Sequence, residues 1–499
     1  MRRGGTDLGA APFTYQTGIS RMSSEITEFA AAPRAPALEG FWSGVREALR
    51  GSRRDYTEGA VGRAILLLAV PMVLEMVMES IFAVCDVFFV SRLGADAVAT
   101  VGLTESILTI IYALAMGLAI GATAMVARRI GERDTDGAAR AAVQAIALGS
   151  AIAIVLGVAG VIAAPTLLGA MGASPTLLAV GTPYARIMFG GNATILLLFL
   201  VNAIFRGAGD AAIAMRVLWL ANAINIALGP CLIFGLGPFP ALGVKGAAIA
   251  TNIGRGVGAL FALSRLLRCR SARVAIARRH VRLEPAVLVR LVRLSASGTL
   301  QALIGTASWI GLIRILSTFG SSVLAGYTIG IRVVVFALLP SWGLSNAGAT
   351  MVGQALGARK PERAERAVWM AGFYNVCFLG VVGALFVLLA RPIANIFTSD
   401  PSVVPSAVDA LRIIALGFPF YAYGMVLSAA FNGAGDTTTP TVLNVVVFWL
   451  WEIPLAFVVA KTLGFGPRGV YVAVAVAFSM LAVVSAVIFR RGKWKTRAV

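Results

Sequence analysis

Apolar runs of membrane-spanning length recur along nearly the whole 499-residue chain, and this feature constrains the fold more than any other. Each run has roughly 20 residues or more, which as a helix crosses the ~30 Å hydrocarbon core of a bilayer. Only 13% of the residues are charged, about half of what a soluble protein carries. The pattern predicts an all-α polytopic membrane protein. The twelve predicted spans are 64–91, 103–127, 138–164, 183–205, 214–235, 244–267, 287–317, 328–354, 366–390, 409–432, 439–461 and 469–490.

Basic residues are distributed unevenly between the predicted loops. The net charge is +20, and with an inside N-terminus most of the 43 Lys and Arg fall in the tails and loops of the inner side. The positive-inside rule therefore predicts a multi-pass protein of the cell (inner) membrane with both termini in the cytoplasm. It accounts for the charge without nucleic-acid binding. The exceptions are Arg92, Lys245, Arg391, Lys461 and Arg468 in opposite loops, and Arg186, Arg314, Arg332 and Arg412 within spans.

The chain contains two copies of one pattern. FRGAGD at 205–210 returns as FNGAGD at 431–436, and the same offset of 226 residues relates MVARRIG at 125–131 to MVGQALG at 351–357. Each copy holds an even number of spans, so both copies share an orientation, with a pseudo-two-fold axis along the membrane normal. Each GAGD turn predicts a glycine at positive φ and an aspartate that caps the next helix. The expected domains are a largely disordered cytoplasmic tail at 1–55, an N-lobe at 60–268, a basic cytoplasmic linker at 269–285 and a C-lobe at 286–494.

Three carboxylates, Glu75, Glu79 and Asp86, lie in the first predicted span. On a helix they fall within a ~40° arc and extend over ~16 Å along the axis. Such acids avoid lipid only by facing the bundle interior or a water-filled cavity, where they can hold and release protons. They form a candidate ion-coupling site, with acids that merely pin helices together as the alternative. The second copy has no carboxylate at the equivalent positions, Gln301, Gly305 and Leu312.

Polar amides and hydroxyls show the same one-sided distribution. Asn202, Asn225 and Thr251 of the first copy are candidate ion-coupling residues, and Asn192 is a candidate substrate-binding residue. Hard oxygen ligands suit Na⁺ as well as protons, so Na⁺ binding at Asp86 is possible. Each asparagine alone could equally form an interhelical hydrogen bond. The second copy replaces these residues, in chain order from position 192, with Phe418, Ser428, Trp451 and Ala477.

The eleventh span contains an acid of its own, Glu452 in FWLWEIP at 448–454. Tryptophans flank it, and an aromatic face beside a carboxylate suits a lipophilic cation. Glu452, Trp451 and Gln301 are therefore candidate substrate-binding residues. A salt bridge from Glu452 to Arg314 or Arg332 is the alternative.

The sequence offers little to support an enzyme. The only histidine, His280, lies in the basic linker, and no GxxxxGK[ST] motif or DDxxD motif is present. Four cysteines show no CxxC spacing, so a metal site built on His and Cys is excluded. We expect no cofactor beyond H⁺ or Na⁺ as the coupling ion. The expected partners are small organic cations and the lipid bilayer, with the protein as a monomer.

The chain resembles the MATE (multidrug and toxic compound extrusion) transporters over about residues 60–490. The resemblance rests on LAVPMVLEMVMESIFAVCDVFFVSRLGADAVATVGL at 68–103, on the two GAGD turns, and on GVKGAAIAT at 243–251. It implies a V-shaped bundle of two six-helix lobes that exports organic cations in exchange for protons or sodium ions. The DinF-like branch is similar in its aspartate, asparagine and threonine at the positions of Asp86, Asn225 and Thr251.

Two departures qualify this resemblance. The family often has Asp-Pro after the asparagine, whereas this chain has Gly229-Pro230. The NorM-like branch uses further acids in the seventh and tenth helices. Here the first position falls near Gly305, and the tenth helix has no acid between Leu411 and Asn432. The chain is thus closer to the DinF-like pattern. Pro71 and Pro454 are expected flexible points. A flippase for a lipid-linked glycan, which would need a basic cavity, is the alternative function.

Overall fold

A computed structural model of the protein describes residues 37–52, 54–268 and 273–497. The chain divides into two compact units, residues 1–46 and 47–499, and each is taken by itself. In the first unit the described part is the beginning of helix α2 (Ala37–Arg50). The disorder expected of the tail concerns mainly residues 1–36, which lie outside the described part. The rest of the fold belongs to the second unit.

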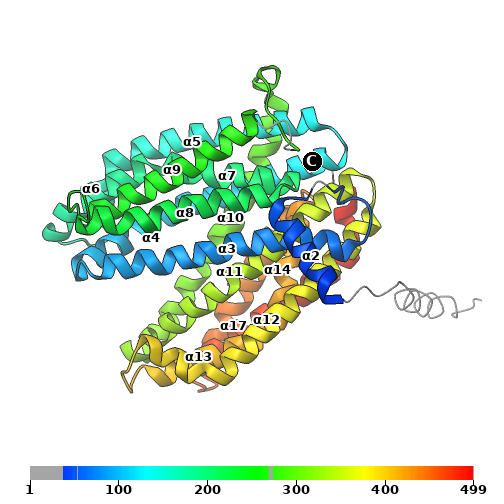
Figure 1. The fold of residues 1–499 in the computed structure, drawn as a ribbon. Coiled ribbons are helices and arrows are strands. Elements are labelled where there is room, and N and C mark those ends of the chain that lie inside the picture. Colours follow the sequence, from blue (N-terminus) through cyan, green and yellow to red (C-terminus); the bar gives the residue numbers. More distant parts are fainter. Residues whose placement is uncertain (1–36, 53, 269–272, 498–499) are drawn as a thin grey trace, which may run out of the picture. The chain divides into compact units, whose positions relative to one another are not determined.

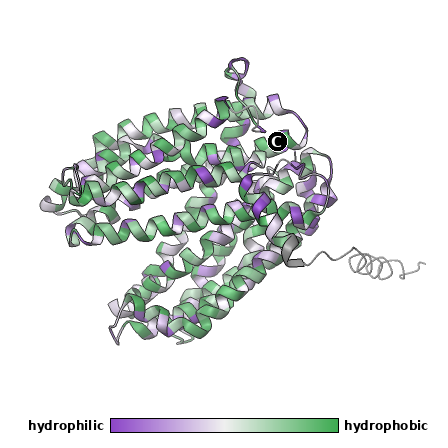
Figure 2. Ribbon diagram, viewed as in Figure 1, coloured by the Kyte–Doolittle hydropathy of each residue, from purple (hydrophilic) through white to green (hydrophobic). Residues whose placement is uncertain are grey.

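In the described residues of the second unit all regular structure is helical (Figure 1). Hydrophobic residues run along the long helices, and hydrophilic residues gather at the loops (Figure 2). By length and composition, eleven helices can cross a membrane, or twelve if one bent pair counts as a span. All twelve predicted spans coincide with them. The unbroken ones are α3 (Val61–Ser91), α4 (Ala95–Gly131), α5 (Thr135–Ala170), α8 (Ala211–Phe234), α9 (Val244–Arg268), α10 (Pro285–Leu316), α11 (Ser321–Gly357), α12 (Pro361–Phe397) and α17 (Pro467–Arg490).

Three spans are interrupted. The fourth is α6 (Pro175–Gly190) followed by α7 (Asn192–Ala208). The tenth is α13 (Val404–Leu416) followed by α14 (Phe418–Gly433), bent by 59° at Gly417. The eleventh passes from α15 (Thr438–Asn444) through a π-helix (Val445–Glu452) to α16 (Ile453–Phe457) and a second π-helix (Val458–Thr462). The breaks at Gly191 and Gly417 are related by the repeat offset.

The repeat extends to backbone geometry. Helices α3–α9, here called the first half, and α10–α17, the second half, share unusual dihedral angles at equivalent positions. The left-handed φ values are 98° and 107° at Gly94 and Gly320, 60° and 57° at Arg133 and Arg359, and 86° and 83° at Gly209 and Gly435. Arg186 and Arg412 also donate equivalent hydrogen bonds, to the carbonyl oxygens of Val161 and Val387 at 3.3 and 3.1 Å.

In the GAGD turns, the predicted positive φ of the glycine is confirmed, and the predicted capping of the next helix by the aspartate is wrong. Both third-position glycines have positive φ. Asp210 precedes α8, yet its side chain makes no capping bond to the helix. Its carboxylate instead accepts from the backbone N–H of Arg273 at 2.8 Å, and Asp436 accepts from the Thr439 hydroxyl at 2.7 Å. The Asp210 carboxylate thus binds the charged loop after α9 instead of capping α8.

The two halves meet through backbone contacts at one end of the bundle, here called the base: the ends of α4, α7, α11 and α17 and the start of α3. A Cβ on Gly131 would overlap the carbonyl oxygen of Gln354, and one on Gly357 would overlap that of Arg128. Only glycine allows such an approach. Hydrogen bonds reinforce it. Gln354 Nε2 donates to the Gly207 carbonyl at 2.9 Å, and the Thr350 hydroxyl donates to the Arg206 carbonyl at 3.1 Å.

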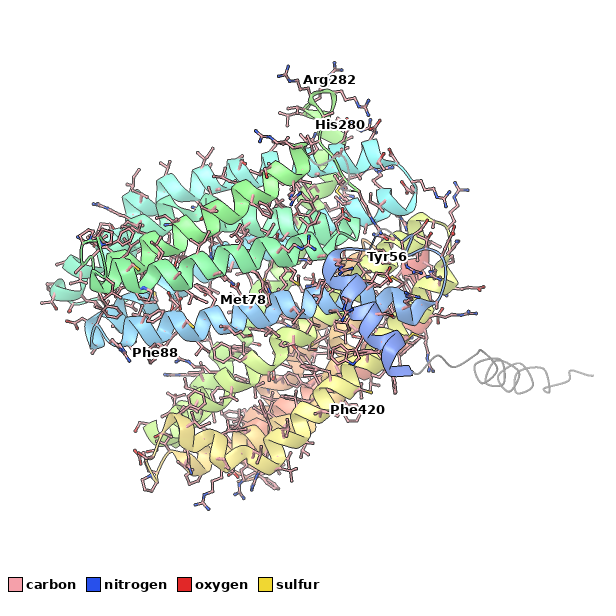
Figure 3. All side chains as sticks on the ribbon, viewed as in Figure 1. Tyr56, Met78, Phe88, His280, Arg282 and Phe420 are labelled. Atoms are coloured by element: carbon pink, nitrogen blue, oxygen red, sulfur yellow. The ribbon has the colours of Figure 1, made fainter. Side chains whose placement is uncertain are left out.

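Residues 54–60, here called the strap, run across the base to α3. The Tyr56 hydroxyl donates to the Gly209 carbonyl of the first half at 3.3 Å. The Arg363 guanidinium of the second half donates to the carbonyls of Tyr56, Glu58 and Gly59 at 3.0, 2.8 and 2.7 Å. Partial burial acts to raise the pKa of Asp55, but hydrogen bonds from Thr57 hold that pKa below its usual range. Figure 3 shows Tyr56 at this end and Phe88 at the other end of α3.

Candidate functional site

The three acids of α3 face different partners. Helix α3 packs against α8 of the first half and α11 of the second. Pro71, buried in the first part of α3, removes one backbone donor from that helix. Glu75, Glu79 and Asp86 follow it about one, two and four turns further along, and the structure surrounds each with different groups.

Glu75 is ion-paired through one of its two carboxylate oxygens, while its Oε2 is buried without a hydrogen bond. Its side chain is 1% exposed, and its Oε1 accepts from Arg206 Nη1 at 2.7 Å and from Asn202 Nδ2 at 3.3 Å. Both partners lie on α7. The arginine supplies the charge compensation that a buried carboxylate needs. Glu75 thus fits the alternative of an acid that joins helices, and Asn202 is directed to Glu75.

Glu79 lies one turn further along α3 and has polar neighbours from α8 and α9. Its Oε2 accepts from Asn222 Nδ2 of α8 at 3.0 Å, and its Oε1 lies 3.9 Å from Arg255 Nη2 of α9. The Arg255 guanidinium also donates to the Tyr112 hydroxyl of α4 at 2.9 Å. Glu79 is therefore only loosely compensated by a cation, and about a quarter of its side chain is exposed.

Asp86 is the acid with the weakest protein partners. It is half-buried, and within the described residues its carboxylate takes part in no hydrogen bond or ion pair. It does interact electrostatically with Arg255 and with Glu105 of α4. A carboxylate held in this way keeps its lone pairs available for a proton or a cation.

The predicted oxygen ligands divide into separate groups. Asn225 Nδ2 of α8 donates to the Thr251 hydroxyl of α9 at 2.9 Å, and both residues are buried. The Asn225 Oδ1 faces Gly229, whose other near neighbour is the Phe89 ring of α3, one turn beyond Asp86. Asn192 is buried at the start of α7 against Gly157 of α5, with neither side-chain atom hydrogen-bonded.

In the second half, Glu452 is 2% exposed and ends a π-helical turn, a feature frequent at functional sites. Among the described residues it has no ion pair with Arg314 or Arg332, so the predicted alternative of a salt bridge is wrong. It is close enough to Tyr327 and Tyr421 to act on them electrostatically. Trp451 remains 44% exposed. The side-chain oxygen of Gln301 is buried without a hydrogen bond, while its backbone carbonyl accepts from Asn444.

Sequence reasoning missed three charged residues of this region: Arg206, Arg255 and Glu105. The count of basic residues within spans omitted both arginines, yet Arg255 lies in the middle of α9 and is buried. A signal for them was present in the repeat. The second half has Asn432, Leu481 and Ile331 at the equivalent positions, so the fold does not require these charges.

A duplicated helical bundle of eleven to twelve candidate spans, with acids and arginines buried inside it, is typical of a membrane transporter. The family model MatE matches the chain twice, at residues 71–231 and 300–458. The protein belongs to this family, whose members are transporters and not enzymes. The two matched ranges fall one in each half.

Relatives and solved structures agree with this assignment. The "Probable multidrug resistance protein NorM" of Thermotoga maritima is 26% identical over 444 residues, covering 88% of this chain and 94% of the relative. The protein of the same name from Caulobacter vibrioides is 29% identical over 448 residues, covering 87% and 92%. A structure described as "Outward-facing conformation of a multidrug resistance MATE family transporter of the MOP superfamily" superposes with a TM-score of 0.83 at 28% identity, covering 91% of this chain and 99% of that one.

Proposed function

We propose that the protein is a secondary antiporter that exports amphipathic or cationic organic compounds in exchange for protons or sodium ions, with Asp86 as the coupling carboxylate. One observation carries this assignment: of the three acids of α3, Asp86 alone lacks a hydrogen-bonding or ion-pairing side chain among the described residues. The relatives are named as probable multidrug resistance proteins, which favours a drug-like cargo.

The proposed cycle depends on the cost of burying charge. An ionised Asp86 is stable while water or an ion reaches it, and costly to enclose when neither does. Binding of a coupling ion removes that cost, which allows α3 to repack against α8 and α9. The Asn225–Thr251 pair lies between those two helices and offers the Asn225 Oδ1 as a further ligand. Glu79 provides a second, weaker site on the same face of α3.

The proposed cargo site uses aromatic and acidic groups. Trp451 and Trp449 are both about half exposed, so their rings can contact a lipophilic cation. Glu452, Gln301 and Asn192 are assigned to cargo binding on weaker grounds, because each is largely buried and contributes only after a rearrangement. The flippase alternative is not favoured, since Arg186 and Arg412 are occupied by backbone carbonyls rather than free to line a basic cavity.

The proposed setting is the inner membrane, with the base toward the cytoplasm and the protein as a monomer of the DinF-like branch. The basic side chains of the loop after α9, including Arg282 beside His280 in Figure 3, support that orientation through the positive-inside rule. The DinF-like placement rests on Asp86, Asn225 and Thr251, and on the absence of acids in α13 and α14 apart from Asp409.

Dye efflux from proteoliposomes tests the proposal. Ethidium would be loaded inside right-side-out vesicles, and a pH gradient or a Na⁺ gradient would be imposed in turn. Wild-type protein is expected to release the dye under at least one gradient, and Asp86→Asn to lose at least 90% of that rate while remaining folded. Asp96→Asn, which neutralises an exposed acid in the first turn of α4, is the control and should retain most activity. Full activity in Asp86→Asn would refute the assignment.

A further inference from the structure

A buried arginine, Arg255 of α9, lies beside the acids of α3. The Arg255 side chain is 7% exposed, and its guanidinium carbon lies 5.7 Å from the ring centres of both Phe82 and Tyr112. Its Nη1 donates to the Tyr112 hydroxyl at 2.9 Å. The proposed function assigns this cation no role. A guanidinium removed from water is costly, so its retention in this half requires compensating groups.

The arginine is not required by the bundle. The equivalent residue of the second half is the buried Leu481, and the residues equivalent to Phe82 and Tyr112 are the buried Ser308 and Leu338. The second half thus builds the same helix crossing with uncharged side chains. Arg255 and its aromatic cradle accompany the acids of α3, which are also confined to the first half.

Arg255 lies on α9, opposite the part of α3 between Glu79 and Asp86. Phe82 lies about one turn from Glu79 on one side and from Asp86 on the other, so a guanidinium over its ring adjoins both turns. One nitrogen is 3.9 Å from Glu79, and Arg255 acts electrostatically on Asp86. It is therefore a cation that both carboxylates can share.

Other charged and titratable groups face the same space. Glu105 of α4 interacts electrostatically with Asp86, Arg255 and the second-half residue Arg332. Tyr184 of α6 and Tyr112 of α4 complete the set. From α8 come only the neutral amides Asn222 and Asn225. Among these groups Arg255 is the cation buried within the first half.

We propose that Arg255 is a tethered counter-cation for Asp86, which makes the coupling ion a proton rather than Na⁺. This inference rests on the proposed function, since it names the ion bound at the same carboxylate. A sodium ion needs several oxygen ligands and a negative site, and a fixed guanidinium nearby repels it. A proton needs only one carboxylate oxygen. When Asp86 loses its proton, Arg255 compensates the charge from within the protein.

The remaining geometry agrees with a proton. Asn225 Nδ2 already donates to the Thr251 hydroxyl, so one oxygen that could ligate Na⁺ is engaged. Gly229 contributes no side-chain oxygen beside Asn225. The neighbours that α3 supplies to Arg255 and Gly229 are the apolar rings of Phe82 and Phe89, which offer no oxygen ligand.

The test combines ion binding with transport, using the full-length protein. In detergent at pH 7.5, NaCl replaces choline chloride and the melting temperature is followed. Wild type is expected to show no sodium-specific shift, whereas Arg255→Gln should gain one that the double variant Asp86→Asn, Arg255→Gln lacks. Removing a unit positive charge from the neighbourhood of Asp86 should tighten Na⁺ binding about tenfold or more. Arg186→Gln removes another arginine of the same half and should leave ion preference unchanged.

Proteoliposomes supply the second readout. Wild type and Arg255→Lys should release ethidium under a pH gradient and not under a Na⁺ gradient, and Arg255→Gln should respond to Na⁺. Sodium-driven efflux by wild type, or a folded Arg255→Gln with wild-type ion preference, would overturn the inference. If Arg255→Gln fails to fold, the wild-type and Arg255→Lys results still decide whether the coupling ion is a proton or Na⁺. Failure of the proposed function is distinct, because it appears as gradient-driven efflux that survives Asp86→Asn.

Discussion

At the scale of single residues, Glu75 and Asp86 lie on the same face of α3 and differ in what compensates them. Glu75 is enclosed with Arg206, whereas Asp86 is half-buried and interacts with Arg255 at longer range. The former arrangement is expensive to disturb, since removal of one member leaves a buried charge. The latter can change its protonation without unpairing a neighbour. We therefore expect the two acids to respond differently to neutralisation.

Glu75→Gln is expected to destabilise the protein by about 3 kcal/mol or more, because Arg206 would stay buried without its carboxylate. Thermal unfolding in detergent, followed by tryptophan fluorescence, measures the change. Removing both charges in Glu75→Gln, Arg206→Gln should recover much of the lost stability, and Asp86→Asn should melt near wild type. A wild-type melting temperature in Glu75→Gln combined with abolished efflux would instead make Glu75 part of the coupling site.

The sequence predicted the acids better than their partners. The column on α3 followed from helical spacing, and comparison of the two halves showed that the fold does not need it. The arginines were missed because basic residues were used only to assign the two sides of the membrane, and only acidic and polar residues were compared between the two halves. Arg255 has Leu481 as its counterpart, so the same comparison applied to basic residues identifies it. Which acid pairs with which arginine depends on side-chain reach between helices, and that is not encoded in spacing along one helix.

At the scale of secondary-structure elements, the predicted spans agree with the helices, and their breaks are the new information. Gly191 and Gly417 interrupt equivalent spans, and the second bends by 59°. Hydropathy cannot reveal such breaks, because the residues on both sides remain apolar. The π-helical turns around α16 are hidden for the same reason, although Pro454 marks their neighbourhood. Pro71 and Pro454 remain predicted flexible points.

Gly131→Ala tests the packing of α4 against α11. The added methyl would overlap the Gln354 carbonyl, and such overpacking costs about 1–3 kcal/mol. The cost applies only while the base is closed, so the variant should favour states in which the halves separate there. A cysteine replacing the buried Ala355, in a variant without native cysteines, should then react several-fold faster with a water-soluble maleimide.

Gly102→Ala is the matched control for this substitution. It lies on the same helix, and a Cβ there would meet nothing within 4 Å. Its effect on labelling should be negligible. Equal labelling rates in Gly131→Ala and Gly102→Ala would show that the contact does not govern opening at the base.

At the scale of the whole second unit, the base links the two halves through the strap as well as through helices. Arg363 alone donates to three carbonyl groups of the strap, while Tyr56 attaches the strap to the other half. Nothing in the hydropathy pattern predicted this. Every residue has a carbonyl oxygen, so the sequence contains no particular side chain that marks these acceptors. Only the folded backbone reveals them.

Arg363→Gln is expected to free the strap without unfolding the helices. Loss of the guanidinium removes three hydrogen bonds, each contributing about 1 kcal/mol. Hydrogen–deuterium exchange of peptides covering residues 54–60 should rise at least several-fold, with exchange in α4 and α11 unchanged. Arg366→Gln, which alters an exposed arginine nearby, is the control. Unaltered exchange in Arg363→Gln would mean that other contacts hold the strap.

The glycine contacts at the base affect how readily ions can leak through the protein without transport of cargo. At Gly131 and Gly357 the backbones of α4 and α11 meet with no side chain between them, and a Cβ there would already overlap the facing carbonyl oxygen, so these two positions leave no space for a water molecule. Protons hop along files of water molecules, and a file through the bundle would dissipate the gradient without moving any cargo. A base closed by main-chain contact therefore limits slippage whatever compound occupies the opposite end. A transporter with varied cargo can thus change its binding surface without weakening the main-chain contact that closes the base.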